Sequence, residues 1–329
     1  MSRYAEAHKN LAGPGDARPT ALQIIKDEGL EGKMKDKVFL VTGASSGIGI
    51  ETGRALAATG AKVFLTARSL EKGRAACASF LEPGRVELLK LDTSDLSSVR
   101  SAAASFLQKS PTLNVLVCNA AVMQIPEREE TSEGFEMQLA TNYLGHFLLF
   151  DLLKDALLKA STPEFNSRLV NVSSSGHHAS EIEFDDFQLK GPGVYSPWKG
   201  YGQSKLAQIY MANYVDRHFG PLGLHGLSLM PGGIRTGLQK YVPDKVKETW
   251  DTKPEIAVFM KSVEQGAATT VLAAVGKEFE GKGGKYLEDC DVAVTEPIIE
   301  TMKGVKPYVF DEKKQDRLWE LTRETLGLA

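Results

Sequence analysis

The sequence predicts an α/β fold: a single doubly wound parallel sheet of the Rossmann type, with helices on both faces. Short apolar runs alternate along the chain with longer amphipathic stretches, and this alternation is typical of parallel βαβ units. The runs lack the apolar–polar alternation of half-exposed strands, so each strand is expected to be buried on both faces. No Pro-, Gly- or Ser-rich linker divides the chain, so we expect one domain.

The elements follow in order from the N-terminus. Residues 1–34 are expected to form an arm with a short helix from about Thr20 to Glu28, and residues 35–329 the Rossmann-type domain. The predicted strands are Val38–Val41, Lys62–Thr66, Val86–Leu91, Val115–Cys118, Arg168–Val172 and Gly226–Met230. The predicted helices are Ile48–Thr59, Leu70–Phe80, Leu96–Lys109, Glu133–Lys159 and Gly202–Phe219. Two insertions, near 175–200 and 232–260, follow the carboxyl ends of strands, where open α/β sheets bind ligands.

Composition excludes several classes of protein. The 329 residues carry 39 Lys and Arg against 42 Asp and Glu, a net charge of −3, so the chain lacks the basic surface typical of nucleic-acid binding and of attraction to anionic membranes. It has neither the apolar run of about 18 residues that predicts a membrane span nor the pattern of a secretory signal. Its three cysteines are far apart and lack metal-ligand spacing, which fits a reducing compartment. We therefore expect a cytoplasmic protein without a metal.

A glycine-rich turn follows the first predicted strand and precedes the first helix of the sheet, with the spacing G-x-x-x-G-x-G. Glycines let a backbone approach a pyrophosphate, and a helix N-terminus supplies free N–H groups and a favourable dipole. The residues predicted to contact a dinucleotide here are Gly43, Ser45, Ser46, Gly47, Ile48 and Gly49. The alternative is a tight strand–helix turn that binds no ligand.

The end of the second predicted strand indicates which dinucleotide is preferred. An NAD site usually places an acidic residue here for the ribose 2′-hydroxyl, whereas this chain has Ala67 followed by Arg68. A guanidinium suits a 2′-phosphate, so we predict NADP(H) as the cofactor. The alternative is that Arg68 is a solvated surface charge.

Tyr201 and Lys205 form a candidate acid–base pair at the start of the fifth predicted helix. Residues four apart on a helix lie on the same face. A free tyrosine has a pKa of about 10, and a nearby ammonium lowers that pKa by favouring the phenolate. The spacing alone is common, but a serine cluster, Ser173 to Ser175, leaves the preceding strand. Together the two features predict a catalytic site.

Several motifs together resemble the short-chain dehydrogenase/reductase family. They occur in the family's order between about Lys35 and Cys290, and they are Thr42-Gly43-x-x-x-Gly47-x-Gly49, Cys118-Asn119-Ala120-Ala121, Asn142, the Ser174 cluster, Tyr201-x-x-x-Lys205 and Pro231-Gly232. Segments 141–147, 171–174 and 264–269 look like the branch that contains retinol dehydrogenases, WW-domain oxidoreductases and protochlorophyllide reductases. The chain departs from the family pattern at Ala121, where glycine is usual, and in a wider Ser174–Tyr201 interval.

The resemblance implies a role for each matching residue. Tyr201 would exchange a proton with the substrate oxygen, and Lys205 would lower the pKa of Tyr201 and hold the nicotinamide ribose. Ser174, with Ser173 as the alternative, would hydrogen-bond the substrate, and Asn142 would hold a water molecule in a proton relay. The cofactor contacts implied beyond the glycine turn are Arg68, Asp92, Asn119, Ala120, Tyr201, Lys205, Pro231, Gly232, Ile234 and Thr236. Family members often dimerise through helices that include the one bearing Tyr201, so a homodimer is one expected arrangement, although this branch also includes monomers.

The two insertions indicate the kind of substrate. They contain the aromatic residues Tyr195, Trp198, Tyr241 and Trp250, which predict a clamp for a bulky lipophilic ketone, aldehyde or alcohol. The alternative is that these rings only pack the two insertions together.

The predicted function is NADP(H)-dependent reduction of a lipophilic carbonyl, or the reverse oxidation. A non-redox enzyme of the same fold (a dehydratase, epimerase or cyclase) and a dinucleotide-sensing binding protein are the alternatives. The intact set of Ser174, Tyr201 and Lys205 argues against both.

Overall fold

The computed structural model describes residues 2–298 and 303–328. Its central sheet has eight strands in the order β10-β9-β6-β5-β4-β1-β2-β3. The strands are β1 (Val38–Val41), β2 (Lys62–Ala67), β3 (Val86–Lys90), β4 (Val115–Cys118), β5 (Ser167–Val172), β6 (Leu224–Met230), β9 (Lys285–Glu288) and β10 (Asp291–Val292). All neighbours in the sheet pair in parallel except β9 and β10. The predicted doubly wound parallel sheet is confirmed.

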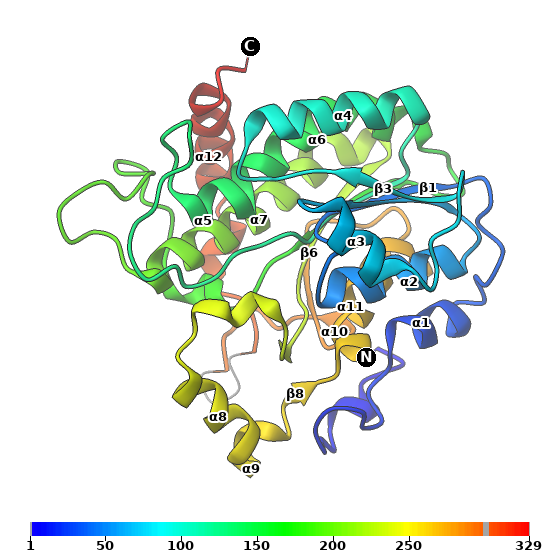
Figure 1. The fold of residues 1–329 in the computed structure, drawn as a ribbon, viewed down its shortest axis with the longest axis horizontal. Helices are drawn as coiled ribbons and strands as arrows, with labels where there is room; N and C mark the ends of the chain where they lie inside the picture. Colours follow the sequence, from blue (N-terminus) through cyan, green and yellow to red (C-terminus); the bar gives the residue numbers. More distant parts are fainter. Residues whose placement is uncertain (1, 299–302, 329) are drawn as a thin grey trace.

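Helices cover both faces of this sheet (Figure 1). One face carries α2 (Ile48–Ala58), α3 (Leu70–Cys77) and α11 (Ala268–Val275), with α1 (Ala21–Asp27) and α10 (Val263–Gly266) packed beside them. The other face carries α4 (Leu96–Lys109), α6 (Gly145–Ala160), α7 (Pro197–Phe219) and α12 (Glu312–Thr325). In β1, Phe39 and Val41 pack into the first layer and Leu40 into the second. Burial on both faces explains why the strands read as unbroken apolar runs.

The helix predicted over Leu70–Phe80 ends at Cys77, and two other predicted helices differ more from the structure. The helix that bears Tyr201 begins at Pro197, because Ser196 caps its N-terminus and proline occupies the first turn, two start signals that the sequence contained. The helix predicted over Glu133–Lys159 is divided into α5 (Met137–Leu139), a π-helical segment η2 (Ala140–Leu144) and α6. The Glu136 carboxylate accepts hydrogen bonds from the backbone N–H groups of Gln138 and Leu139. Glu136 is therefore the N-cap, and the helix begins at Met137 and not at Glu133.

The C-terminal helix α12 packs on the outer side of α6 and α7, and the sequence analysis did not predict it. The indole of Trp319 stacks on Tyr214 of α7, with ring centroids 3.9 Å apart, and meets Phe147 of α6 edge-on at 4.6 Å. Tyr143 and Thr322 share a buried hydrogen bond of 2.8 Å. The helix that bears Tyr201 is therefore covered by the sheet on one side and by α12 on the other.

The insertion after β6, residues 232–260, is called the flap below. It contains β7 (Gly233–Ile234), η5 (Gly237–Tyr241), α8 (Asp244–Thr252), α9 (Pro254–Ala257) and the start of β8 (Met260–Lys261), and β7 pairs with β8 in a separate two-stranded sheet. The remaining short elements are α5, η1 (Glu6–His8), η3 (Ser175–Ala179), η4 (Gly220–Leu222), η6 (Lys277–Phe279) and η7 (Pro307–Phe310). Over the described ranges, no helix combines the length and apolar character needed to cross a membrane.

Candidate active site

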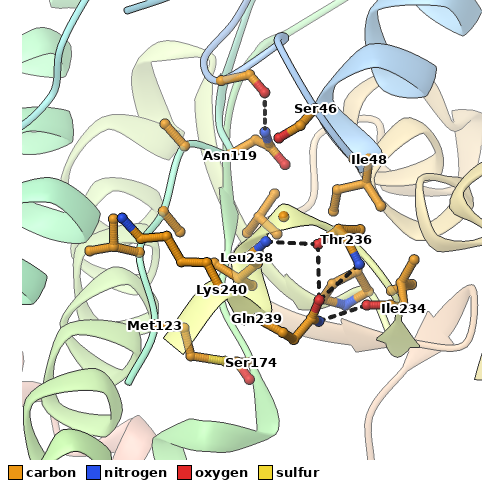
Figure 2. Close-up of a pocket in the computed structure, with 18 of the residues that line it drawn as sticks. Ser46, Ile48, Asn119, Met123, Ser174, Ile234, Thr236, Leu238, Gln239 and Lys240 are labelled. Carbon is orange, nitrogen blue, oxygen red and sulfur yellow. Dashed lines mark hydrogen bonds between the residues drawn. The ribbon is translucent and has the colours of Figure 1, made fainter. Parts of the chain in front are cut away.

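A cavity of ≈ 610 Å³ opens at the carboxyl ends of the parallel strands. One side of it, called the strand-end wall below, consists of the segments 43–48, 66–68, 119–124 and 172–175, joined by Tyr201 and Lys205 of α7. The flap forms the opposite side. Figure 2 shows flap residues Thr236 to Lys240 between Ser46 and Asn119 on one side and Met123 and Ser174 on the other. This is the place where doubly wound sheets bind ligands.

The glycine turn is shaped by close backbone approach. Gly43 and Gly47 have φ values of +76° and +65°, a region that favours glycine. A Cβ on Gly43 would lie 2.8 Å from the Ala120 Cα, and one on Gly49 would lie 2.3 Å from the Gly43 carbonyl oxygen. Among the described residues no side chain caps α2, which begins after Gly47. The Ile50 N–H donates to the Gly47 carbonyl at 3.2 Å, and the N–H groups of Ile48 and Gly49 remain available to a ligand. The turn therefore fits the pyrophosphate of a dinucleotide.

Thr42 ties β1 to β4 behind this turn. Its Oγ1 accepts hydrogen bonds from the backbone N–H groups of Asn119 at 2.8 Å and Ala120 at 2.9 Å, and it lies 2.9 Å from His146 Nε2. His146 Nδ1 lies 2.9 Å from the Asn142 carbonyl oxygen, so Nδ1 donates there and Nε2 accepts the Thr42 hydroxyl. Burial lowers the pKa of His146 to about 4, which keeps the ring neutral. His146 was not predicted as a site residue, although it lies in the segment 141–147 that resembles one branch of the family.

Ser174, Tyr201 and Lys205 all line the cavity. The Ser174 Oγ accepts from the Gly176 N–H at 3.0 Å and interacts with the Tyr201 phenol. Ser173 is buried, and its hydroxyl donates to the Lys205 carbonyl at 2.8 Å. Of the two candidate serines, Ser174 is thus the one whose hydroxyl lies beside the phenol.

The pKa of Tyr201 differs from the expectation. Burial raises it to about 12, and the interaction with Ser174 offsets only part of this rise. Lys205 Nζ donates to the Val172 carbonyl at 2.8 Å and to Gln208 Oε1 at 3.1 Å, and it lies 5.7 Å from the Tyr201 ring centroid. Burial lowers the pKa of Lys205 to about 7. The structure does not show the expected lowering of the Tyr201 pKa by Lys205, because burial of the phenolate has the larger effect and Ser174 is the group that opposes it.

Three predicted site residues do not line the cavity: Gly49, Asp92 and Asn142. Gly49 lies behind the turn. The Asp92 carboxylate accepts from the backbone N–H and the hydroxyl of Ser94 at 3.0 and 2.7 Å. The Asn142 amide accepts from the Val122 N–H at 2.8 Å and donates to the Val122 carbonyl at 3.0 Å. In this structure Asp92 and Asn142 hold cavity-wall loops.

The other residues predicted to contact the cofactor do line the cavity. They are Gly43, Ser45, Ser46, Gly47, Ile48, Arg68, Asn119, Ala120, Pro231, Gly232, Ile234 and Thr236. Arg68 is exposed and has no ion-pair partner among the residues that the structure describes. Its guanidinium is therefore free to meet an anionic ligand in the cavity.

The four aromatic residues of the insertions fall into two groups. Trp198 and Trp250 line the cavity, and the Trp198 ring lies edge-on to Tyr201 with centroids 6.2 Å apart. Tyr195 and Tyr241 do not line it, and the Tyr195 hydroxyl instead donates to the Ile125 carbonyl at 2.7 Å. Of the four rings, the two tryptophans are thus the ones placed where a ligand in the cavity could contact them, whereas Tyr195 packs against a loop.

The fold and the cavity define a Rossmann-type α/β protein with a glycine turn facing a serine, a tyrosine and a lysine. A family model described as short chain dehydrogenase matches residues 37–186. Short-chain dehydrogenase/reductase prx1 of Penicillium roqueforti is 56% identical over 328 residues, which cover 99% of this chain and 96% of that protein. Human retinol dehydrogenase 12 is 34% identical over 299 residues, covering 90% of this chain and 88% of that protein.

A solved structure shares the fold of this chain. The crystal structure of an uncharacterised Mycobacterium paratuberculosis protein superposes with a TM-score of 0.65 at 29% identity, covering 88% of this chain and 92% of that one. The chain belongs to the short-chain dehydrogenase/reductase family, whose members are oxidoreductases that act on C=O and CH–OH groups with a nicotinamide dinucleotide. The predicted family is confirmed, including its resemblance to the retinol dehydrogenases.

Proposed function

We propose that this chain is an NADP(H)-dependent oxidoreductase that reduces the carbonyl group of a bulky lipophilic ketone or aldehyde, or oxidises the corresponding alcohol. The observation that carries the proposal is the meeting of Ser174, Tyr201 and Lys205 in one cavity with the glycine turn. In this proposal residues 35–329 form the catalytic unit.

The cofactor site would run along the strand-end wall. The free N–H groups at the start of α2 suit the pyrophosphate, and the unpaired Arg68 suits a 2′-phosphate. Asn119 and Ala120, fixed by Thr42, would contact a ribose, and Pro231 with the first flap residues up to Thr236 would contact the nicotinamide end. When bound, the cofactor supplies or accepts the hydride.

Tyr201 would act as the acid in reduction. With a pKa of about 12, the phenol stays protonated at neutral pH and its hydroxyl can donate to a carbonyl oxygen. Ser174 would donate a second hydrogen bond to the same oxygen, and Lys205 would hold the ribose. Positioned proton transfer of this kind contributes about 10²–10⁴-fold to the rate. In the reverse reaction the phenolate form of Tyr201 would accept the proton of the alcohol.

The remainder of the cavity suits a lipophilic substrate. Its apolar lining, from both insertions and the loop after β4, consists of Met123, Trp198, Leu238, Trp250, Ile256 and Met260. Apolar walls with a few convergent polar groups are typical of sites for lipophilic small molecules.

Tyr201→Phe tests the reaction class. With NADPH and a panel of carbonyl compounds, we expect the wild type to consume one NADPH for each alcohol formed and to prefer bulky lipophilic substrates. The variant should lose about 10²–10⁴-fold in kcat while its Kd for NADPH stays within about twofold, because only the phenol hydroxyl is removed. Tyr214→Phe, on the same helix and stacked on Trp319, is the matched control and should retain activity.

Three outcomes would contradict the proposal. Product formation without net NADPH consumption would identify a non-redox enzyme of this fold. Full turnover by Tyr201→Phe would remove the phenol from the reaction. A preference for small polar carbonyls would overturn the substrate class alone.

A further inference from the structure

Arg18 is a buried arginine of the N-terminal arm that contacts the far end of the flap. It is 4% exposed. Its Nε donates to Asp16 Oδ1 at 2.8 Å, Nη1 donates to the Phe259 carbonyl at 3.1 Å, and Nη2 donates to the carbonyls of Gly13 at 3.0 Å and Met260 at 2.5 Å. One planar guanidinium thus joins the arm to two consecutive flap carbonyls. A buried arginine needs such partners, since its charge is costly to desolvate without them.

Gln265 of α10 fixes the same part of the arm from another side. It is 2% exposed. Its Oε1 accepts from the Gly15 N–H at 2.9 Å, and its Nε2 donates to the carbonyls of Asp16 and Arg18, each at 3.1 Å. Burial alone would raise the pKa of Asp16. The hydrogen bonds that its carboxylate accepts, above all the one from the Arg18 side chain, outweigh burial and lower this pKa to about 2. The Asp16–Arg18 ion pair therefore persists at neutral pH. The segment around Arg18 is therefore a fixed point from which the flap can be held.

One of the two flap carbonyls that Arg18 binds belongs to a residue that lines the cavity. Met260 lines the cavity and begins β8, where it pairs with Gly233 of β7, and Ile256 and Ile234 line the cavity nearby. Figure 1 places the N-terminal arm beside β8. The hydrogen bonds of the Arg18 side chain reach Asp16, Gly13 and the flap, so we expect a shift at Arg18 to move Met260 more than Tyr201 or Lys205.

We propose that Arg18 is a positioning residue that sets the place of flap residues 256–260 and thereby the fit of bulky substrates. This inference rests on the proposed function for its link to substrate binding. Arg18 touches no reacting atom and acts through backbone carbonyls. A lysine keeps the charge but lacks the planar fork that holds two carbonyls and a carboxylate at once.

Arg18→Lys is the test, with two readouts. Hydrogen exchange should become about tenfold faster over residues 253–262, since the backbone there loses its anchor, and stay unchanged in β1 and β5. The KM for a bulky ketone should rise about tenfold with kcat within about threefold, as expected for a loss of uniform substrate binding. Arg3→Lys is the matched control, because this arm arginine contacts Asp27 and Glu28 and not the flap. It should change neither readout.

Unchanged exchange over residues 253–262 would overturn the proposal, and so would faster exchange with an unchanged KM. Should Arg18→Lys fail to fold, Asp16→Asn gives a milder test, since it weakens the hold on the guanidinium while Arg18 remains. The same segment should then exchange faster, by a smaller factor. If the wild type reduces no carbonyl compound at all, the proposed function fails, and the exchange data still decide whether Arg18 fixes the flap.

Discussion

The two sides of the cavity are held in place by different interactions. The strand-end wall continues from β1, β2, β4 and β5, whose parallel register is fixed by the hydrogen bonds of the sheet. The flap is held by two strands of two residues each, by the Thr236–Gln239 capping box and by Arg18. The strand-end wall therefore derives more of its geometry from backbone pairing, whereas the flap depends more on side chains. This contrast predicts that the same kind of substitution has unequal effects on the two sides.

The largest difference is expected between two glycines. A Cβ on Gly49 would lie 2.3 Å from the Gly43 carbonyl and 2.6 Å from Asn119 Nδ2, whereas one on Gly237 would meet nothing closer than Ser46 Oγ at 3.6 Å. Gly49→Ala should lower the free energy of unfolding by about 3 kcal/mol, as overpacking against backbone does. Gly237→Ala should change it by less than about 0.5 kcal/mol. Urea unfolding measures both, and equal losses would break the contrast.

The second difference concerns two lysines and pH. Burial lowers the pKa of Lys205 to about 7, while an unfolded lysine holds its proton to about pH 10.4. Between these values the unfolded chain binds more protons, so stability should rise with pH. In urea unfolding of the cofactor-free protein from pH 7 to 9, the wild type should gain about 1 kcal/mol per pH unit relative to Lys205→Met.

Lys240→Met removes an exposed lysine of the flap and is the control for this experiment. It should follow the pH dependence of the wild type. Parallel curves for the wild type and Lys205→Met would mean that Lys205 stays charged when buried.

The smallest difference is expected between two arginines. Arg68 lines the cavity and forms no ion pair with any residue in the described part of the chain. Arg235 of the flap pairs with Asp251 at 3.5 Å and does not line the cavity. The preference for NADPH is measured as the ratio of kcat/KM with NADPH to kcat/KM with NADH. Arg68→Ala should reduce this ratio by about tenfold, because one charge-assisted contact is lost. Arg235→Ala should leave the ratio within about twofold. An unchanged preference in Arg68→Ala would remove the basis for predicting NADP(H).

The same contrast explains what the sequence could predict. β1 and the glycine turn follow from local rules, because an unbroken apolar run and closely spaced glycines fix a strand and a tight turn whatever lies far away in the chain. Tyr201 and Lys205 were found because four residues span one helical turn. The bounds of their helix were missed although Ser196 and Pro197 carry its start signal.

The features that were missed depend on contacts between distant parts of the chain. Arg18 binds the carbonyl of Phe259, 241 positions away, and no local pattern indicates that contact. The pKa of Tyr201 follows from how deeply the ring is buried, which spacing does not reveal. His146 accepts the hydroxyl of Thr42 from 104 positions away, so its part in holding the glycine turn emerges only in three dimensions.

The packing of α12 bears on self-association. Trp319 occupies the outer faces of α6 and α7, and Arg217 pairs with Asp316 at 2.5 Å at the rim. A second copy that approached α7 from this side would meet α12 first and would have to detach it, leaving a large indole exposed to water. A homodimer that used the outer face of α7 would therefore require α12 to leave its place on the molecule.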